Sequence, residues 1–79
     1  MSREEVYERL NAVFQDVFDD ETITVNDGTT ANDIEEWDSL EHINLIVAVE
    51  EGFGIKFGMG EVNGMKNVGE MVDIILKKS

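Results

Sequence analysis

The sequence predicts an all-α fold, a small four-helix bundle with three main helices, one short helix and a long first crossover loop. Apolar residues recur at helical spacing in three segments, and each segment starts with a short polar residue followed three positions later by glutamate. The 79 residues include no proline, the commonest helix breaker. One short segment alternates like a strand, but no second strand is available to pair with it.

The first helix is predicted to begin after Ser2, which forms a capping box with Glu5. It should end near Phe18, because the acids at 19–21 would sit badly at the negative end of the helix dipole. The apolar residues on its predicted inner face are Val6, Leu10, Val13, Phe14 and Val17.

Residues 19–37 form the predicted crossover. The segment is mostly polar and contains the turn signal Asn26-Asp27-Gly28. A loop of this length in a small domain is either functional or disordered. Four apolar residues favour an ordered loop anchored over the core, namely Ile23, Val25, Ile34 and Trp37.

The second helix is predicted from Ser39 to about Glu51, with Asp38 and Glu41 as its capping box and Gly52 and Gly54 at its end. The β-branched run at 45–49 resembles a strand, but the cap before it favours a helix. The predicted inner face consists of Leu40, Ile43, Val47 and Ile46.

A glycine-rich loop follows, with a short helix predicted from Glu61 to Met65. The last helix is predicted from Val68 to about Lys77, behind a capping box of Asn67 and Glu70. Its predicted buried residues are Val68, Met71, Val72, Ile75 and Leu76. We interpret residues 1–79 as one domain.

The chain is strongly acidic, and its charges are unevenly distributed. The net charge is −12, and residues 1–51 hold fifteen acids and two bases. This charge disfavours binding to nucleic acid or to an anionic membrane and favours basic protein partners, although solubility alone is an alternative explanation. A charged start and the lack of a long apolar stretch predict a cytoplasmic protein without a membrane segment.

Several kinds of chemistry are excluded. Without cysteine there is no disulfide, thiolate metal site or cysteine nucleophile. An EF-hand aligned on Gly28 would place Ile23 and Val25 at ligand positions. His42 is the single histidine and is expected to be an exposed helical residue; with Ser39 it lacks a third catalytic partner. We therefore predict no metal site and no self-contained hydrolytic activity.

The segment Trp37-Asp38-Ser39-Leu40-Glu41-His42-Ile43, with the residues that follow it to Phe57, closely resembles the acyl and peptidyl carrier proteins. The resemblance extends over essentially the whole chain, including its length, acidic bias and long crossover. It implies a non-enzymatic carrier. In this family the serine of an Asp-Ser-Leu motif receives 4′-phosphopantetheine from coenzyme A, and cargo is carried as a thioester on this arm.

Carried over residue by residue, the resemblance makes Ser39 the attachment site. Asp38 matches the acid that lies where the transferase's metal meets the incoming phosphate. Leu40 matches an apolar residue contacted by modifying and partner enzymes. The acidic partner-recognition positions are Glu41, Glu50 and Glu51.

The implied partners are a phosphopantetheinyl transferase and acyl- or aminoacyl-loading, acyltransferase or synthase enzymes with basic docking patches, acting on a monomer. Glu35-Glu36-Trp37 before the motif favours a specialised pathway (polyketide, nonribosomal peptide or aminoacyl, or surface polysaccharide or lipid). Fatty-acid synthesis is the alternative. A plain acidic interaction module with unmodified Ser39, or an acidic ion-binding protein, would be different classes of function.

Overall fold

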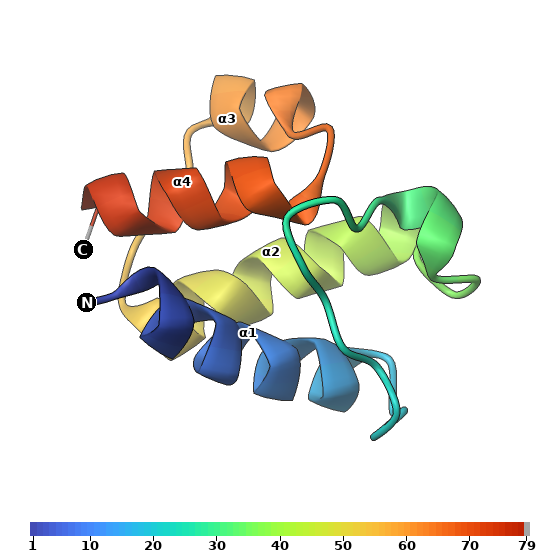
Figure 1. Cartoon of the computed structure of the whole chain (residues 1–79). Coiled ribbons are helices and arrows are strands. Elements are labelled where there is room, and N and C mark those ends of the chain that lie inside the picture. Colours follow the sequence, from blue (N-terminus) through green and yellow to red (C-terminus); the bar gives the residue numbers. More distant parts are fainter. Residues whose placement is uncertain (79) are drawn as a thin grey trace.

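The computed structural model describes residues 1–78 and confirms the all-α fold. Four α-helices and one short 3₁₀ turn follow one another along the chain (Figure 1). Their bounds are α1, Arg3–Val17; η1, Ala31–Asp33; α2, Ser39–Phe53; α3, Met59–Gly64; and α4, Val68–Lys78.

The core lies where α1 packs against α2 and α4 (Figure 1). The helices contribute their apolar faces, and the crossover and the α2–α3 loop add single side chains. The apolar core residues are Val6, Leu10, Phe14, Phe18, Val25, Ile34, Leu45, Ile46, Val49, Ile55, Val68, Met71, Val72 and Ile75. Of the face predicted for α1, Val13 and Val17 are only half-buried.

The first helix begins and ends as predicted. Ser2 Oγ accepts a hydrogen bond from the Glu5 N–H at 3.1 Å, and Glu5 Oε1 accepts one from the Ser2 N–H at 3.2 Å. The helix ends at Val17, with Phe18 as its C-cap and Asp19 at a positive φ of 51°. The reciprocal cap therefore fixes where the chain enters the bundle.

The crossover is ordered because side chains of α1 bind its backbone. Asn11 Oδ1 accepts from the Val25 N–H at 2.7 Å, and Gln15 Nε2 donates to the Ile23 carbonyl at 2.9 Å. The crossover also accepts hydrogen bonds from the start of α4, where the Val68 N–H donates to the Thr29 carbonyl at 2.8 Å. The predicted anchors are confirmed, since Val25 and Ile34 are buried and Ile23 and Trp37 are half-buried.

The predicted inner face of the second helix is wrong. Leu45, Ile46 and Val49 face the core, whereas Leu40, Ile43 and Val47 are 68%, 61% and 48% exposed. The helix carries two apolar stripes, each at helical spacing, so periodicity alone could not identify the one that packs. Of the predicted residues only Ile46 is buried.

Two of the predicted capping boxes form only in part. Asp38 Oδ1 accepts from the Glu41 N–H at 2.9 Å, but the Glu41 carboxylate binds the Asn44 amide instead of closing the box. Asn67 Oδ1 accepts from the Glu70 N–H at 2.9 Å, while Glu70 Oε2 accepts from the N–H of Lys66, one residue before the predicted partner.

The later boundaries differ slightly from the predictions. The short helix starts at Met59 rather than Glu61, because the Glu61 carboxylate accepts the Gly58 N–H at 2.7 Å and so stabilises an earlier first turn. The second helix continues to Phe53 and stops at Gly54, which has a left-handed φ of 66°.

Candidate functional site around Ser39

Ser39 is the first residue of α2 and is exposed. Asp38, its N-cap, is also exposed and holds the first turn through the Glu41 N–H. Since the first N–H groups of a helix lack intrahelical partners and carry partial positive charge, an anion on the Ser39 hydroxyl would be stabilised. The structure thus presents the Ser39 hydroxyl to solvent at a fixed position that favours phosphate.

An open pocket of about 580 Å³ lies directly beside Ser39. It is bounded by α2 on one side and by α3 and the start of α4 on the other. Its lining residues are Ala31, Trp37, Asp38, Ser39, His42, Ile43, Val62, Asn63, Met65, Lys66, Asn67 and Met71. Half of these side chains are apolar or aromatic, among them Ile43, Val62 and Met71, and the other half are charged or polar.

Sequence reasoning missed the far wall of this pocket. Val62, Asn63, Met65 and Lys66 lie more than twenty residues after Ser39, in and after the weakly helical α3. No motif joins them to Ser39 in the sequence. Only the packing of α3 and α4 brings them to the head of α2.

Trp37 and His42 form one wall of the pocket. The indole Nε1–H of Trp37 donates to His42 Nδ1 at 3.0 Å, and the two rings stack with centroids 5.9 Å apart. On its other side Trp37 packs edge-on against Phe14 at 5.3 Å. His42 is therefore half-buried and hydrogen-bonded, not the exposed residue predicted from the sequence. The pair connects the segment before Ser39 to the core.

The outer surface of α2 combines apolar and acidic side chains. Leu40, Ile43 and Val47 form its exposed apolar stripe, and Met59 at the start of α3 is 82% exposed. Glu41 lies beside Ser39 in the first turn of α2. This exposed surface fits contacts with another macromolecule better than it fits a further helix of this bundle.

The other two predicted recognition acids lie at the far end of α2 from Ser39. Glu50 is half-buried, and its Oε2 accepts the Phe57 N–H at 2.7 Å, so its carboxylate holds the loop after α2. Glu51 is exposed. The structure therefore brings Asp38, Leu40 and Glu41 together around Ser39 and separates Glu50 and Glu51 from them.

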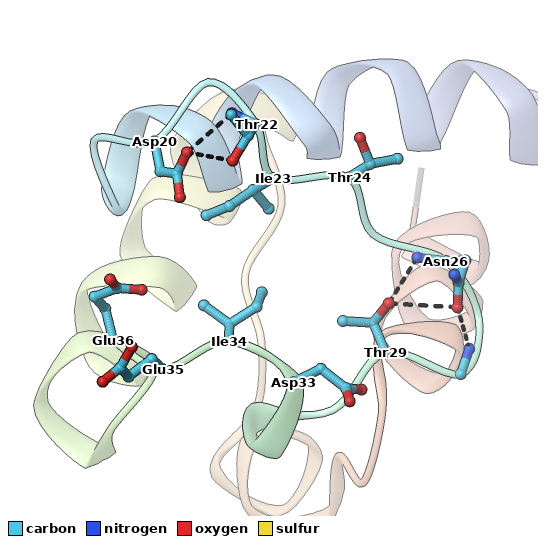
Figure 2. A pocket seen from close by; sticks show the side chains of 11 residues that line it. Asp20, Thr22, Ile23, Thr24, Asn26, Thr29, Asp33, Ile34, Glu35 and Glu36 are labelled. Atoms are coloured by element: carbon cyan, nitrogen blue, oxygen red, sulfur yellow. Dashed lines mark hydrogen bonds between the residues drawn. The ribbon is translucent and has the colours of Figure 1, made fainter.

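A second pocket lies within the crossover, where Ile23 and Ile34 extend toward each other (Figure 2). Acids occur around it, but Asp20 accepts from the backbone and hydroxyl of Thr22, and Asp33 accepts from the Thr30 N–H. Among residues 1–78, no cluster of three His, Cys, Asp or Glu side chains could hold a metal ion. The carboxylates of Asp20 and Asp33 therefore order the loop.

Over the part of the chain that the structure describes, no helix is both long enough and apolar enough to cross a membrane.

Comparison with known proteins gives a consistent result. No protein-family model matches the chain. An acyl carrier protein from Acidothermus cellulolyticus is 33% identical over 95% of this chain and 89% of the relative, and one from Coprothermobacter proteolyticus is 32% identical over 95% and 92%. The solution NMR structure of a holo acyl carrier protein from Geobacter metallireducens superimposes with a TM-score of 0.87 and 46% identity, over 92% of this chain and 84% of that one. The chain belongs to the acyl carrier protein family, whose members are carriers and not enzymes.

Proposed function

We propose that Ser39 is the attachment site of 4′-phosphopantetheine and that the chain carries acyl or aminoacyl cargo as a thioester on this arm. The observation that carries the proposal is the exposed Ser39 hydroxyl at the capped N-terminus of α2, beside an open pocket. The matching structure from Geobacter metallireducens is a holo form, which supports attachment at the corresponding helix in this chain.

The residues present fit such a group. The arm supplies a terminal thiol, which a chain without cysteine lacks. Asp38 fixes the first turn and hence the position of Ser39, and the N–H groups of that turn favour the negative charge of a phosphodiester. The pocket places apolar surface from Ile43, Val62 and Met71 within the same site. Tethering raises the local concentration of cargo at a partner's active site.

The outer surface of α2 is the docking site in this proposal. Its apolar stripe would contact the phosphopantetheinyl transferase and the loading, acyltransferase or synthase enzymes, and its acids would pair with their basic patches. Asp38 would lie next to the phosphate during transfer. Because this surface serves partners in turn, we propose that residues 1–79 act as one monomeric carrier domain in the cytoplasm.

We also propose a specialised pathway rather than primary fatty-acid synthesis. Two observations support this proposal. The segment Glu35-Glu36-Trp37 precedes the motif, and Trp37 lines the pocket while its indole N–H donates a hydrogen bond to His42. Fatty-acid synthesis is the alternative. Loading assays with aminoacyl, hydroxyacyl and simple acyl donors distinguish the two.

The test is intact-mass measurement after incubation with coenzyme A, Mg²⁺ and a broad-specificity transferase. The wild type should gain one phosphopantetheine and Ser39→Ala none. Folding should change little, because Asp38 still caps α2 and alanine is a good helix former. A modified alanine variant would move the site elsewhere. A wild type that several transferases leave unmodified would favour the acidic interaction module, whose binding surface on α2 needs no arm.

A further inference from the structure

Cations are scarce in this chain, and within residues 1–78 two of them form ion pairs. Against eighteen acids there are six Lys and Arg residues. Arg3 pairs with Asp27 and Asp73, and Lys78 pairs with Glu61. Among the described residues that line the Ser39 pocket, Lys66 is the one Lys or Arg. Its position is therefore notable in a chain with so few positive charges.

The backbone at Lys66 is fixed while its side chain remains available. Lys66 lies between α3 and α4, and its N–H donates to Glu70 Oε2 at 2.8 Å. Two residues later, the Val68 N–H donates to the Thr29 carbonyl of the crossover. The residue is exposed, and its ammonium takes part in no ion pair within residues 1–78. Because the backbone is already fixed and the ammonium forms no ion pair, binding an anion here would cost little further conformational entropy.

The proposed function places an anion at this pocket. A phosphodiester on Ser39 carries one negative charge and would lie beside the carboxylates of Asp38 and Glu41, in the half of the chain with the largest acidic excess. The cation on the opposite wall of the open pocket offsets part of that repulsion, and because Ser39 and Lys66 are both exposed, salt screens their attraction.

We propose that Lys66 is a positioning residue that binds the phosphate of the arm and turns the pantetheine toward α3, across the mouth of the pocket. The inference rests on the proposed attachment at Ser39. In this arrangement the thioester end lies over the pocket interior. A partner that offers its own basic group competes for the same phosphate and thereby releases the arm for reaction.

The experiment measures the mobility of the arm in the holo protein by NMR relaxation of isotope-labelled pantetheine amides. The variants are Lys66→Gln, Lys66→Arg and the control Lys56→Gln. Lys56 is also exposed, but it lies in the loop after α2, away from Ser39. Both glutamine variants remove one positive charge, so a general effect of net charge would appear in both.

We expect amide order parameters above about 0.6 in the wild type, in Lys66→Arg and in Lys56→Gln, and lower values in Lys66→Gln. Raising the salt concentration to about 1 M, where the Debye length is near 3 Å, should lower the wild-type values as well. An arm that is equally mobile in wild type and Lys66→Gln, or equal effects of the two glutamine variants, would overturn the inference. Failure of the proposed function is separate, because intact mass would then show no arm on the wild type.

Discussion

Asp38 has two roles in this account, and the two can be separated. Its carboxylate caps α2 through the Glu41 N–H, and it stands next to the hydroxyl that we propose is modified. Replacing Asp38 with alanine removes both functions. Replacing it with asparagine keeps a capping oxygen and removes only the charge.

We predict that Asp38→Ala lowers the free energy of unfolding by about 0.5–2 kcal/mol and slows pantetheine transfer. Asp38→Asn should keep most of the stability and still show slow transfer. Urea unfolding and the rate of mass gain measure the two effects independently. Full transfer by the asparagine variant would mean that only the cap matters.

Tyr7 belongs to a polar cluster with Arg3, Asp27 and Asp73, which the sequence analysis did not predict. Its hydroxyl donates to Asp27, which also accepts from Arg3 at 2.7 Å, and Arg3 reaches Asp73 on α4. Burial first, and then the hydrogen bond and charge of Asp27, raise the pKa of Tyr7 to about 12. The same contacts, first the Tyr7 hydroxyl and then Arg3, lower the pKa of Asp27.

The pH dependence follows from the sign of this shift. Because the folded pKa lies above the usual tyrosine value of about 10, the stabilisation from Tyr7 is complete below pH 10 and lost as pH rises through about 12. Tyr7 is the sole tyrosine, so tyrosinate absorbance follows it directly. Asp27→Asn should lower its pKa part of the way toward 10, since burial remains. An unchanged titration would show that Asp27 has no influence on Tyr7.

At the scale of the elements, the crossover depends on a close approach to α4. The Gly69 N–H donates to the Asp27 carbonyl at 3.1 Å, and a Cβ at position 69 would lie 2.9 Å from that same oxygen. Backbone cannot move aside as easily as a flexible side chain. The glycine is thus required by proximity, not by a left-handed φ.

Gly69→Ala should destabilise the protein by about 1–3 kcal/mol, as expected for overpacking. Gly60→Ala is the matched control, because Gly60 is also helical and a Cβ there meets nothing within 4 Å. The control should be neutral or stabilising by up to about 1 kcal/mol. Thermal unfolding of both variants measures the difference; equal stability would contradict the close contact.

The outer surface of α2 gives a prediction about docking. Glu50 is unsuitable for the test because its carboxylate holds the Phe57 N–H. We therefore compare two double variants. The first carries Glu41→Gln and Glu51→Gln on α2, and the second carries Glu8→Gln and Asp16→Asn on α1. Both doubles remove the same charge, but only the first changes the proposed docking surface.

The α2 double should slow modification by the transferase far more than the α1 double, because at ordinary salt charges more than about 10 Å from the contacts are screened. Higher salt also screens the charges at the contacts, so the difference in rate between the two doubles should shrink as salt rises. Modification rates at matched stability and several salt concentrations provide the measurement. Equal effects of the two doubles would assign the acidic surface to solubility alone.

At the scale of the whole molecule, caps and turn signals located the helices well. Ser2, Asp38 and Asn67 each cap the predicted helix, because capping is a local interaction that a few neighbouring residues determine. The orientation of α2 could not be predicted in this way. Leu40 and Leu45 belong to different apolar stripes of one helix, and packing against α1 decides which is buried.

The site shows the same division between local and non-local information. Asp38, Ser39 and Leu40 are adjacent in sequence, so the motif alone could indicate the head of α2. Lys66 enters the pocket only through the packing of α3 and α4. The hydrogen bond from Trp37 to His42 forms because the turn before α2 brings the indole back toward the first turns of the helix. The spacing of apolar residues does not predict this contact.

The measurement that tests the carrier account most directly is mass spectrometry of the protein isolated from its own cells, with fragmentation of the peptide that contains Ser39. We predict that Ser39 carries phosphopantetheine in most molecules and that a fraction bears a further acyl or aminoacyl mass, released by hydroxylamine as a thioester. Protein isolated from growing cells with a bare Ser39 throughout would contradict the account.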